Sequence, residues 1–399
     1  MVAKRTIARD RWLTPGVRGI GAASLLSDLG HEVPTALLPR FVTSLGGSAA
    51  ALGVIEGIAD GLAGIARLAG GALADDPHRR RATAVGGYTS VVILSGLIGA
   101  ATSVWQVAVL RAGAWTARGL RVPSRNALLA DATPREVYGR AYGFERMMDN
   151  LGAIGGPILA LLLVELFSVR TAILLSIIPG LMATFAILYA IRKLSKLEDR
   201  ERQPIRLRVR PVIRAGLGKL MLGVSAFELG NVAATLLILR ATELLAPTRG
   251  GDPATSVALV LYICYNAAAT LASVPAGHAS DRTTPRLVLS GGVVAFLVAY
   301  TIFALIGPSV PLLLLAFVLS GIGIGCVETA EHAAVAAAAP ADIRGSAFGL
   351  LASVQSLGNL AASAITGIIW TVASPTAAFI YLATWMLVAG ILLSRRRRT

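Results

Sequence analysis

The sequence predicts an all-α integral membrane protein whose twelve transmembrane helices form two pseudo-symmetric six-helix bundles. Three observations lead to this prediction. The 399 residues are 55% hydrophobic and only 15% charged, whereas an ordinary soluble chain contains about 25% charged residues. Apolar runs long enough to cross a bilayer fill most of the chain. The two halves of the chain also match each other at particular Gly, Pro and acidic positions.

The helices follow from the apolar runs and from the charged residues that separate them. In chain order we expect helices at 18–40, 49–73, 83–103, 105–121, 139–166, 170–191, 215–243, 254–279, 287–307, 309–333, 345–371 and 374–394. The predicted domains are a cytoplasmic tail (1–17), an N-terminal bundle (18–191), a cytoplasmic linker (192–214), a C-terminal bundle (215–394) and a basic tail (395–399). This arrangement leaves no room for a large soluble catalytic domain.

The distribution of Lys and Arg predicts the orientation in the membrane, because short cytoplasmic loops contain more of them. Every second gap and both ends of the chain collect these residues, including 79–81 and both Arg121 and Arg125, which we place in a loop after the fourth helix. The opposite side has only Arg40, Arg170, Arg240 and Arg249. We therefore expect a multi-pass protein of the cytoplasmic (inner) membrane with both termini in the cytoplasm.

The net charge of +15 lies in scattered loops between hydrophobic segments. A nucleic-acid-binding protein instead needs a contiguous basic face. The expected partners are the lipid bilayer, a small-molecule solute and protons, with no nucleic acid, and we expect a monomer.

An internal repeat relates the two halves. A shift of 206 residues places Asp75 on Asp281, Gly143 on Gly349 and Gly152 on Gly358, while the first helices match at a shift of 200, which places Asp28 on Glu228. In transporters built from two such parallel repeats, the substrate binds between the repeats near the bilayer midplane.

The loop after the second helix, Gly71 to Arg81 (GALADDPHRRR), and its weaker copy at 277–282 resemble the signature loop of the major facilitator superfamily. The segments 27–39 and 126–131 are similar to a largely uncharacterised prokaryotic branch of that family. The resemblance implies the fold of the superfamily. It also implies a conformational gate that helps to hold the outward-facing state, formed here by Gly71, Asp75, Arg79, Arg80, Asp281 and Arg282.

The fifth helix resembles the motif that the superfamily associates with antiporters. Gly143, Gly152, Gly156 and Pro157 match this motif, but its closing glycine pair is replaced by Ala160 and Leu161. These residues can equally serve only as a small-residue packing face with a proline kink. Both interpretations stay open, and in either one the four residues have a helix-packing role.

Ionisable residues inside the predicted helices are costly in a bilayer and therefore require a reason. Three pairs of acids are spaced four residues apart, which places each pair on one helix face: Asp28 with Glu32, Glu56 with Asp60, and Glu145 with Asp149. We expect these faces to line the cavity or to meet Arg67, Arg111, Arg118 or Arg146. The residues Glu145, Arg146 and Asp149 lie near the cytoplasmic start of the fifth helix, which favours a gate salt bridge.

We predict that Asp28, Glu32 and Glu228 form the proton-coupling site, because a carboxylate in an apolar site can become protonated in the range where proton gradients act. The predicted substrate cavity includes His31, Glu56, Asp60, Arg111 and Glu328. Arg111 is either an anion clamp or a structural partner of Glu56 or Asp28. We place Glu331 and His332 at the solvated end of the tenth helix. His31 between two carboxylates also leaves a metal-ion path open.

These features together predict a secondary active transporter that works by alternating access. The leading hypothesis is a proton-coupled antiporter that exports a small amphiphile or drug; proton-coupled uptake of a metabolite and metal-ion transport are the alternatives. The sequence has no phosphate loop and no zinc-protease motif, so we expect neither an enzyme nor a cofactor nor a resident metal. A receptor or scaffold built on a transporter fold stays open if the buried acids are fully paired.

Overall fold

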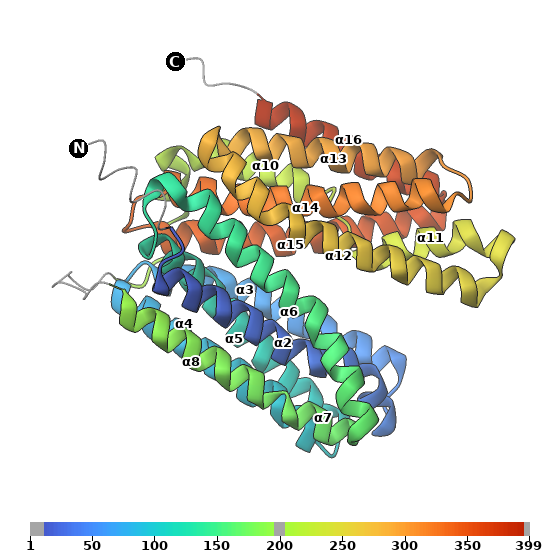
Figure 1. Cartoon of the computed structure of the whole chain (residues 1–399), viewed down its shortest axis with the longest axis horizontal. Coiled ribbons are helices and arrows are strands. Elements are labelled where there is room, and N and C mark those ends of the chain that lie inside the picture. Colours follow the sequence, from blue (N-terminus) through green and yellow to red (C-terminus); the bar gives the residue numbers. More distant parts are fainter. Residues whose placement is uncertain (1–11, 195–203, 395–399) are drawn as a thin grey trace. The chain divides into compact units, whose positions relative to one another are not determined.

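The computed structural model describes residues 12–194 and 204–394 (Figure 1), and these residues contain helices and no strand. Residues 1–11 of the predicted N-terminal tail, residues 195–203 of the predicted linker and the predicted tail 395–399 lie outside the described residues. The chain divides into two compact units. Unit 1 is Met1–Ala141, Met148–Val212 and Ala339–Ser353, and unit 2 is Tyr142–Met147, Ile213–Ala338 and Val354–Thr399.

The helices of the first half are mostly in unit 1. They are α2 (Pro15–Ser44), α3 (Ala49–Ala74), α4 (Pro77–Leu97), α5 (Val104–Asp131), α6 (Tyr138–Leu166), α7 (Val169–Leu175) and α8 (Ile177–Lys193), with short 3₁₀ turns η1 (Ile98–Ala100) and η2 (Arg135–Val137). Helix α5 packs against α3 and α4, while α2 and α4 pack against α8. Helix α5 thus packs against α3, which contains Glu56 and Asp60.

The helices of the second half are mostly in unit 2. They are α9 (Val209–Val212), the π-turn η3 (Ile213–Leu217), α10 (Gly218–Glu228), α11 (Ala234–Arg249), α12 (Gly251–Arg282), α13 (Pro285–Leu305), α14 (Val310–Ala338), α15 (Arg344–Val372) and α16 (Pro375–Ser394). Helix α14 packs against α12 and α13, and α16 packs against α10 and α13. Stacked rings of Phe303 and Phe379, 5.1 Å apart, lie in the core between α13 and α16.

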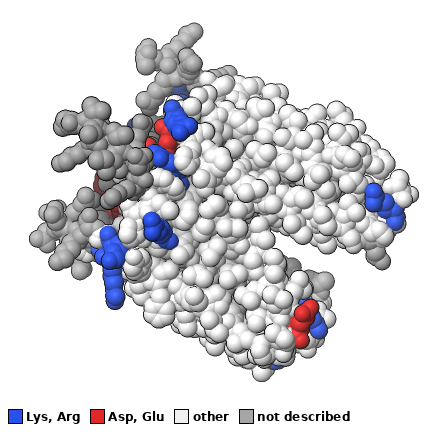
Figure 2. Space-filling model, in the orientation of Figure 1, with Lys and Arg blue, Asp and Glu red and all other residues white. Residues whose placement is uncertain are grey.

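The described chain contains twelve helical segments of membrane-spanning length, as predicted. Eight of them are long and apolar enough to cross a bilayer by composition alone. Three of the other four are α2, α3 and α5, which contain ionisable residues. The fourth is formed by α10 and α11 together, with a break between them. In the view of Figure 2 the charged side chains lie at the helix ends and the sides of the helices are uncharged. Several charged residues of the helices, among them Asp28, Arg111 and Glu331, are buried inside the units.

The prediction that the fourth helix ends at residue 121 was wrong. Helix α5 continues to Asp131 through an internal Pro123. Arg121 and Arg125, which we placed in a cytoplasmic loop, are 1% and 4% exposed inside unit 1. A local hydropathy count cannot detect this, because partners on other helices compensate both charges.

The predicted seventh helix, 215–243, is interrupted between α10 and α11. In the break, the Asn231 carbonyl accepts a hydrogen bond from the Asn359 side chain (2.7 Å), and the Ala233 N–H donates to the Ser363 hydroxyl (3.0 Å). Both partners are on α15. Irregular backbone at membrane depth requires such substitutes, because the lipid offers none.

Several other helix ends differ from the prediction, and two of these differences change the surroundings of charged residues. Helix α4 starts at Pro77, so that Arg79 to Arg81 belong to its first turns, and the Asp76 carboxylate caps it by accepting from the N–H groups of His78 and Arg79 (2.8 and 3.1 Å). Helix α14 extends to Ala338, beyond the predicted end at residue 333. The second change buries two ionisable residues that we had placed at a helix terminus.

The internal repeat appears in the packing of each unit. In unit 1, a methyl group on Gly152 would lie 2.8 Å from Cβ of Asp28. In unit 2, a methyl group on Gly358 would collide with Cβ of Glu228. The same pair of repeat-related positions is therefore in close backbone contact in both units, which confirms the two pseudo-symmetric copies.

Candidate functional site

Four arginines form a stripe along α5, namely Arg111, Arg118, Arg121 and Arg125. Their spacings of seven, three and four residues place them on one side of the helix. This stripe faces acids and hydroxyl groups of α2, α3 and α6, as the individual contacts show. The result is a series of polar contacts in the interior of unit 1.

Arg111 is a partner of Glu56 on α3. Its Nη2 lies 3.0 Å from the Glu56 carboxylate, its Nη1 donates to the Thr35 hydroxyl (3.0 Å), and its guanidinium lies 3.4 Å from the centroid of the Trp115 ring. The Trp115 indole N–H donates to the Asp60 carboxylate (2.9 Å). Of the alternatives left by the sequence for Arg111, the structure shows the pair with Glu56.

Asp28, His31 and Glu32 form a second cluster, on α2. His31 Nδ1 lies 3.4 Å from the Asp28 carboxylate, and Nε2 lies 3.3 Å from that of Glu32. Arg118 approaches Asp28 at 3.7 Å. The side chain of Asp28 is 4% exposed and that of Glu32 is 25% exposed, so the cluster extends from a buried acid to a partly open one.

The contacts of His31 show where this cluster could hold a proton. Its Nδ1 lies 2.9 Å from the Ser27 carbonyl oxygen, which can only accept, so Nδ1 bears a hydrogen. If the ring is neutral, Nε2 then presents a lone pair toward the Glu32 carboxylate, and two electron-rich atoms repel each other at 3.3 Å. Nε2 has no hydrogen-bond partner among the described residues, so a proton added to Nε2 or to the Glu32 carboxyl would make this contact attractive.

Sequence reasoning missed the roles of Arg121 and Arg125. Arg121 Nη1 donates to the Ser27 hydroxyl (2.7 Å), and its guanidinium lies 4.0 Å from the centroid of the Tyr88 ring. Arg125 Nη1 donates to the Ser24 hydroxyl and to the Asp149 carboxylate, both at 3.0 Å. The seven-residue periodicity from Arg111 to Arg118 and Arg125 was a signal that could have placed them on the same helix.

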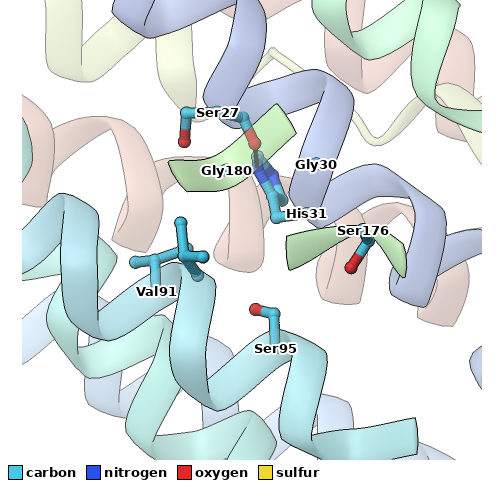
Figure 3. A pocket seen from close by; sticks show the side chains of 8 residues that line it. Ser27, Gly30, His31, Val91, Ser95, Ser176 and Gly180 are labelled. Carbon is cyan, nitrogen blue, oxygen red and sulfur yellow. Dashed lines mark hydrogen bonds between the residues drawn. The ribbon is translucent and has the colours of Figure 1, made fainter. Parts of the chain in front are cut away.

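A small cavity lies beside the His31 cluster, between α2, α4 and the α7–α8 junction (Figure 3). Its volume of about 10 Å³ matches one water molecule. Ser27 and His31 line it from α2, Ser95 lines it from α4, and Ser176 completes the polar lining. The Ser95 hydroxyl is buried and has no hydrogen-bond partner among the described residues. The cavity is thus suited to a water molecule and is too small for a solute.

Several of the predicted gate residues come together in unit 1. A methyl group on Gly71 would lie 2.8 Å from the Gly345 carbonyl oxygen, so the two backbones are in contact. The Asp75 carboxylate accepts from the Ser346 N–H (2.8 Å) and from the Ser346 hydroxyl. Burial raises the pKa of Asp75, while the hydrogen bonds from Ser346 lower it in part.

Arg80 forms an ion pair with Asp131 at the end of α5 and donates to the Ala74 carbonyl (2.7 Å). Arg344 Nη1 lies 3.2 Å from the other oxygen of Asp131. No role was predicted from the sequence for Asp131, Ser346 or Arg344. Of the remaining gate candidates, Asp281 is partly buried and Arg282 is exposed in the last turn of α12, while Arg79 lies in the first turn of α4.

Unit 2 contains the other predicted residues. Glu145 is fully buried and pairs with Arg146 (2.7 Å), whose Nη1 lies 3.9 Å from Glu328. Glu228, at the end of α10, accepts from the Asn231 side chain (2.9 Å). Asp149, which we grouped with Glu145 and Arg146, instead pairs with Arg125 in unit 1.

The prediction that Glu331 and His332 are at a solvated helix end was wrong. Glu331 is 0% exposed and His332 is 4% exposed, because α14 continues for six residues beyond them. The amide of Gln355 on α15 donates to Glu331 Oε1. Glu331 Oε2 is buried without a hydrogen-bond partner among the described residues. Glu331 is thus as fully buried as Glu145, and sequence reasoning did not select it.

The glycines of α6 lie against the acids of α2. A methyl group on Gly156 would collide with Cβ of Glu32, as one on Gly152 would approach Asp28. Pro157 follows inside the same helix. Gly143 is in unit 2, where its Cα faces the Ser273 carbonyl oxygen. The motif glycines therefore allow the close approach that positions the α2 acids.

In the part of the chain that the structure describes, no group of three or more His, Cys, Asp and Glu residues is arranged to hold a metal ion. Asp28, His31 and Glu32 are close in space; His31 Nδ1 is bonded to the Ser27 carbonyl oxygen, and Nε2 lies 3.3 Å from the Glu32 carboxylate without a hydrogen-bond partner among the described residues.

Comparisons with known proteins agree with this architecture. The sequence model of the Major Facilitator Superfamily matches residues 20–261 and 220–399. An uncharacterised MFS-type transporter of Methanocaldococcus jannaschii is 28% identical over 387 residues, which cover 96% of this chain and 95% of the relative. The multidrug resistance protein MdtG of Escherichia coli is 31% identical over 198 residues, which cover 49% of this chain and 45% of MdtG.

Among solved structures, a bacterial homologue of the iron transporter ferroportin in its outward-facing state superposes with a TM-score of 0.75. The match covers 95% of this chain and 98% of that protein at 17% sequence identity. At this identity the likeness concerns the fold alone.

Proposed function

Because the chain belongs to the major facilitator superfamily, a family of multi-pass membrane transporters, we propose that it is a proton-coupled antiporter that exports a small amphiphile by alternating access. It lies in the cytoplasmic membrane as a monomer, with both termini in the cytoplasm. The solute moves outward while protons move inward through the acids of α2. The positive-inside distribution of Lys and Arg supports this orientation.

The observation that supports proton coupling most strongly is the Asp28–His31–Glu32 cluster. Asp28 and His31 are buried in a membrane-spanning bundle, His31 lies within 3.4 Å of both carboxylates, and Arg118 approaches Asp28 at 3.7 Å. One charge that crosses about 100 mV supplies roughly 2.3 kcal/mol. This free energy corresponds to a solute gradient of about fiftyfold.

Export is supported by two weaker observations. The α6 motif typical of antiporters lies against Asp28 and Glu32 themselves, through Gly152 and Gly156. Half of the chain also resembles a protein that is named for multidrug resistance. A structural change at α6 would therefore reach the proton site directly, as exchange of a solute for a proton requires.

The decisive experiment has two steps. Cells with and without the protein are first screened against a panel of toxic amphiphiles, and a compound whose toxicity is reduced is then tested in proteoliposomes under an imposed pH gradient. We expect gradient-driven flux in the wild type, and its loss in Asp28→Asn and Glu32→Gln. Glu165→Gln is the matched control, since Glu165 is an exposed acid near the end of α6. Unchanged coupling in the two α2 variants would reject the proposed proton site.

Metal-ion transport is the second candidate, because His31 lies within 3.4 Å of two carboxylates. Transport of a divalent cation that is abolished by His31→Ala would favour it. Wild-type proteoliposomes that accumulate no divalent cation, or transport that is unchanged in His31→Ala, would eliminate it. Flux with the same polarity as the proton gradient would instead indicate uptake by symport.

A further inference from the structure

The internal repeat relates a salt bridge in unit 1 to an acid–amide pair in unit 2. The shift of 206 residues places Arg125 on Glu331 and Asp149 on Gln355. In unit 1, Arg125 Nη1 and the Asp149 carboxylate are 3.0 Å apart. In unit 2, the Gln355 amide donates to Glu331 Oε1. The same two positions are thus in contact in both repeats, but only the first pair neutralises its own charges.

No basic side chain within the described residues neutralises Glu331 directly. Its closest ionisable contact is His332 Nδ1, 3.9 Å from Oε1, and that nitrogen is already 2.6 Å from the Glu328 carbonyl oxygen. The other charged groups that act on it are Glu228 on α10, Glu328 on α14 and Arg146 on α6. Two of these are acids, and Arg146 is bound to Glu145.

An ionised Glu331 would therefore be a buried anion with one neutral hydrogen-bond donor and an oxygen without a partner. Burial of an uncompensated charge is strongly unfavourable, and an acid in this position is more stable in its neutral form. In unit 1 the positive charge of Arg125 compensates the Asp149 carboxylate. In unit 2 no basic side chain plays this part for Glu331, and a bound proton can neutralise the carboxylate instead.

We propose that Glu331 is a second proton-binding site of this protein, in addition to the α2 cluster, and that it exchanges its proton through Glu328. The proton is bound on Oε2, and the Gln355 amide continues to donate to Oε1 in both protonation states. A role of Glu331 in transport rests on the proton coupling proposed above. The proton bound to Glu331 does not depend on it.

The position of Glu328 supports the exchange route. It precedes Glu331 by three residues on α14, so both side chains lie on neighbouring parts of one helix face. The Glu328 side chain is 30% exposed, whereas that of Glu331 is fully buried. A proton that reaches Glu328 from water can thus pass to Glu331, which leaves Glu328 ionised beside Arg146.

Infrared difference spectroscopy of the full-length protein in lipid nanodiscs tests this proposal without knowledge of the solute. At neutral pH, the spectrum of the wild type minus that of Glu331→Gln is expected to contain the C=O stretch of one protonated carboxyl group. Glu328→Gln is the matched control on the same helix, and its difference spectrum should lack that band. Gln355→Arg supplies a base at the position of Asp149 and is expected to remove the band while Glu331 is retained.

Transfer to D₂O tests the exchange. The wild-type band should shift to lower frequency, and the shift should be at least several-fold slower in Glu328→Gln. A band that is unchanged in Glu331→Gln, or that is lost in Glu328→Gln instead, overturns the bound proton at Glu331. Equal exchange rates in the wild type and in Glu328→Gln overturn the route. Absence of pH-driven flux would refute the proposed antiport, while the infrared band would still report the state of Glu331.

Discussion

Replacement of Asp149 by Asn is expected to destabilise the protein by about 3 kcal/mol. Removal of one partner of a buried ion pair costs about 3–5 kcal/mol, because the other charge stays buried without compensation. The Arg125 side chain is 5% exposed and that of Asp149 is 16% exposed, so the pair qualifies as buried. We expect the lower end of this range, since Arg125 also donates to the Ser24 hydroxyl.

The double variant Arg125→Met/Asp149→Leu separates the pair from the individual side chains. Replacement of both charges by apolar groups is often neutral or stabilising by about 1–4 kcal/mol. The double variant should therefore be more stable than either single variant, with a coupling of at least about 2 kcal/mol. The pair between Arg208 and Asp342 is the control, because the Asp342 side chain is 59% exposed. Asp342→Asn should cost less than about 1 kcal/mol.

The assay is reversible unfolding in mixed micelles, monitored by tryptophan fluorescence. Free energies of unfolding of the wild type, the two single variants and the double variant complete the cycle. Additive effects of the two single substitutions would refute the claim that Arg125 and Asp149 neutralise each other. If Asp342→Asn lowered the free energy of unfolding as much as Asp149→Asn does, burial of the ion pair would not determine the cost of its removal.

Three further predictions concern the gate and the α5 stripe. Gly71→Ala should lower the free energy of unfolding by about 1–3 kcal/mol, because the new methyl group meets backbone at 2.8 Å. In the control Gly86→Ala, the methyl group meets nothing within 4 Å, so the free energy of unfolding should be unchanged or higher. Equal effects of the two substitutions in unfolding experiments would contradict the prediction. Because the pKa of Asp75 is raised, the folded state binds the Asp75 proton more tightly than the unfolded state does, and the resulting stabilisation is present at low pH and is lost as pH rises through the folded-state pKa. The stability of Asp75→Asn relative to the wild type should therefore increase from acidic to neutral pH. Parallel stability–pH curves of the two proteins would exclude this. Arg111→Lys should cost about 1–2 kcal/mol, because an ammonium group cannot both pair with carboxylate and stack on Trp115; unchanged tryptophan emission and stability would refute it.

The helices were predictable because each depends mainly on a local property. A run of about 20 apolar residues identifies a span wherever its neighbours lie, and the repeat placed Asp28 and Glu228 at equivalent positions before their contacts with Gly152 and Gly358 were visible. The family was also indicated by the loop at residues 71–81, whose function depends on a few residues at fixed spacing.

The burial of Arg121, Arg125 and Glu331 could not be predicted in the same way. A charged residue near the end of an apolar run is equally compatible with a solvated loop and with a buried partner on another helix. The partners are distant in sequence: Ser27 is 94 residues from Arg121, and Ser24 is 101 residues from Arg125. Only the packed structure shows which charges are compensated, and that distinction identified Glu331 as the exception.

The break between α10 and α11 has a mechanical consequence. In a continuous helix, a change of direction breaks ladder hydrogen bonds and leaves peptide groups bare in hydrocarbon. Here the side chains of Asn359 and Ser363 form hydrogen bonds with backbone groups of the break. Because these two backbone groups are already paired with side chains of α15, a bend of this span at the break would not leave them unpaired in the lipid.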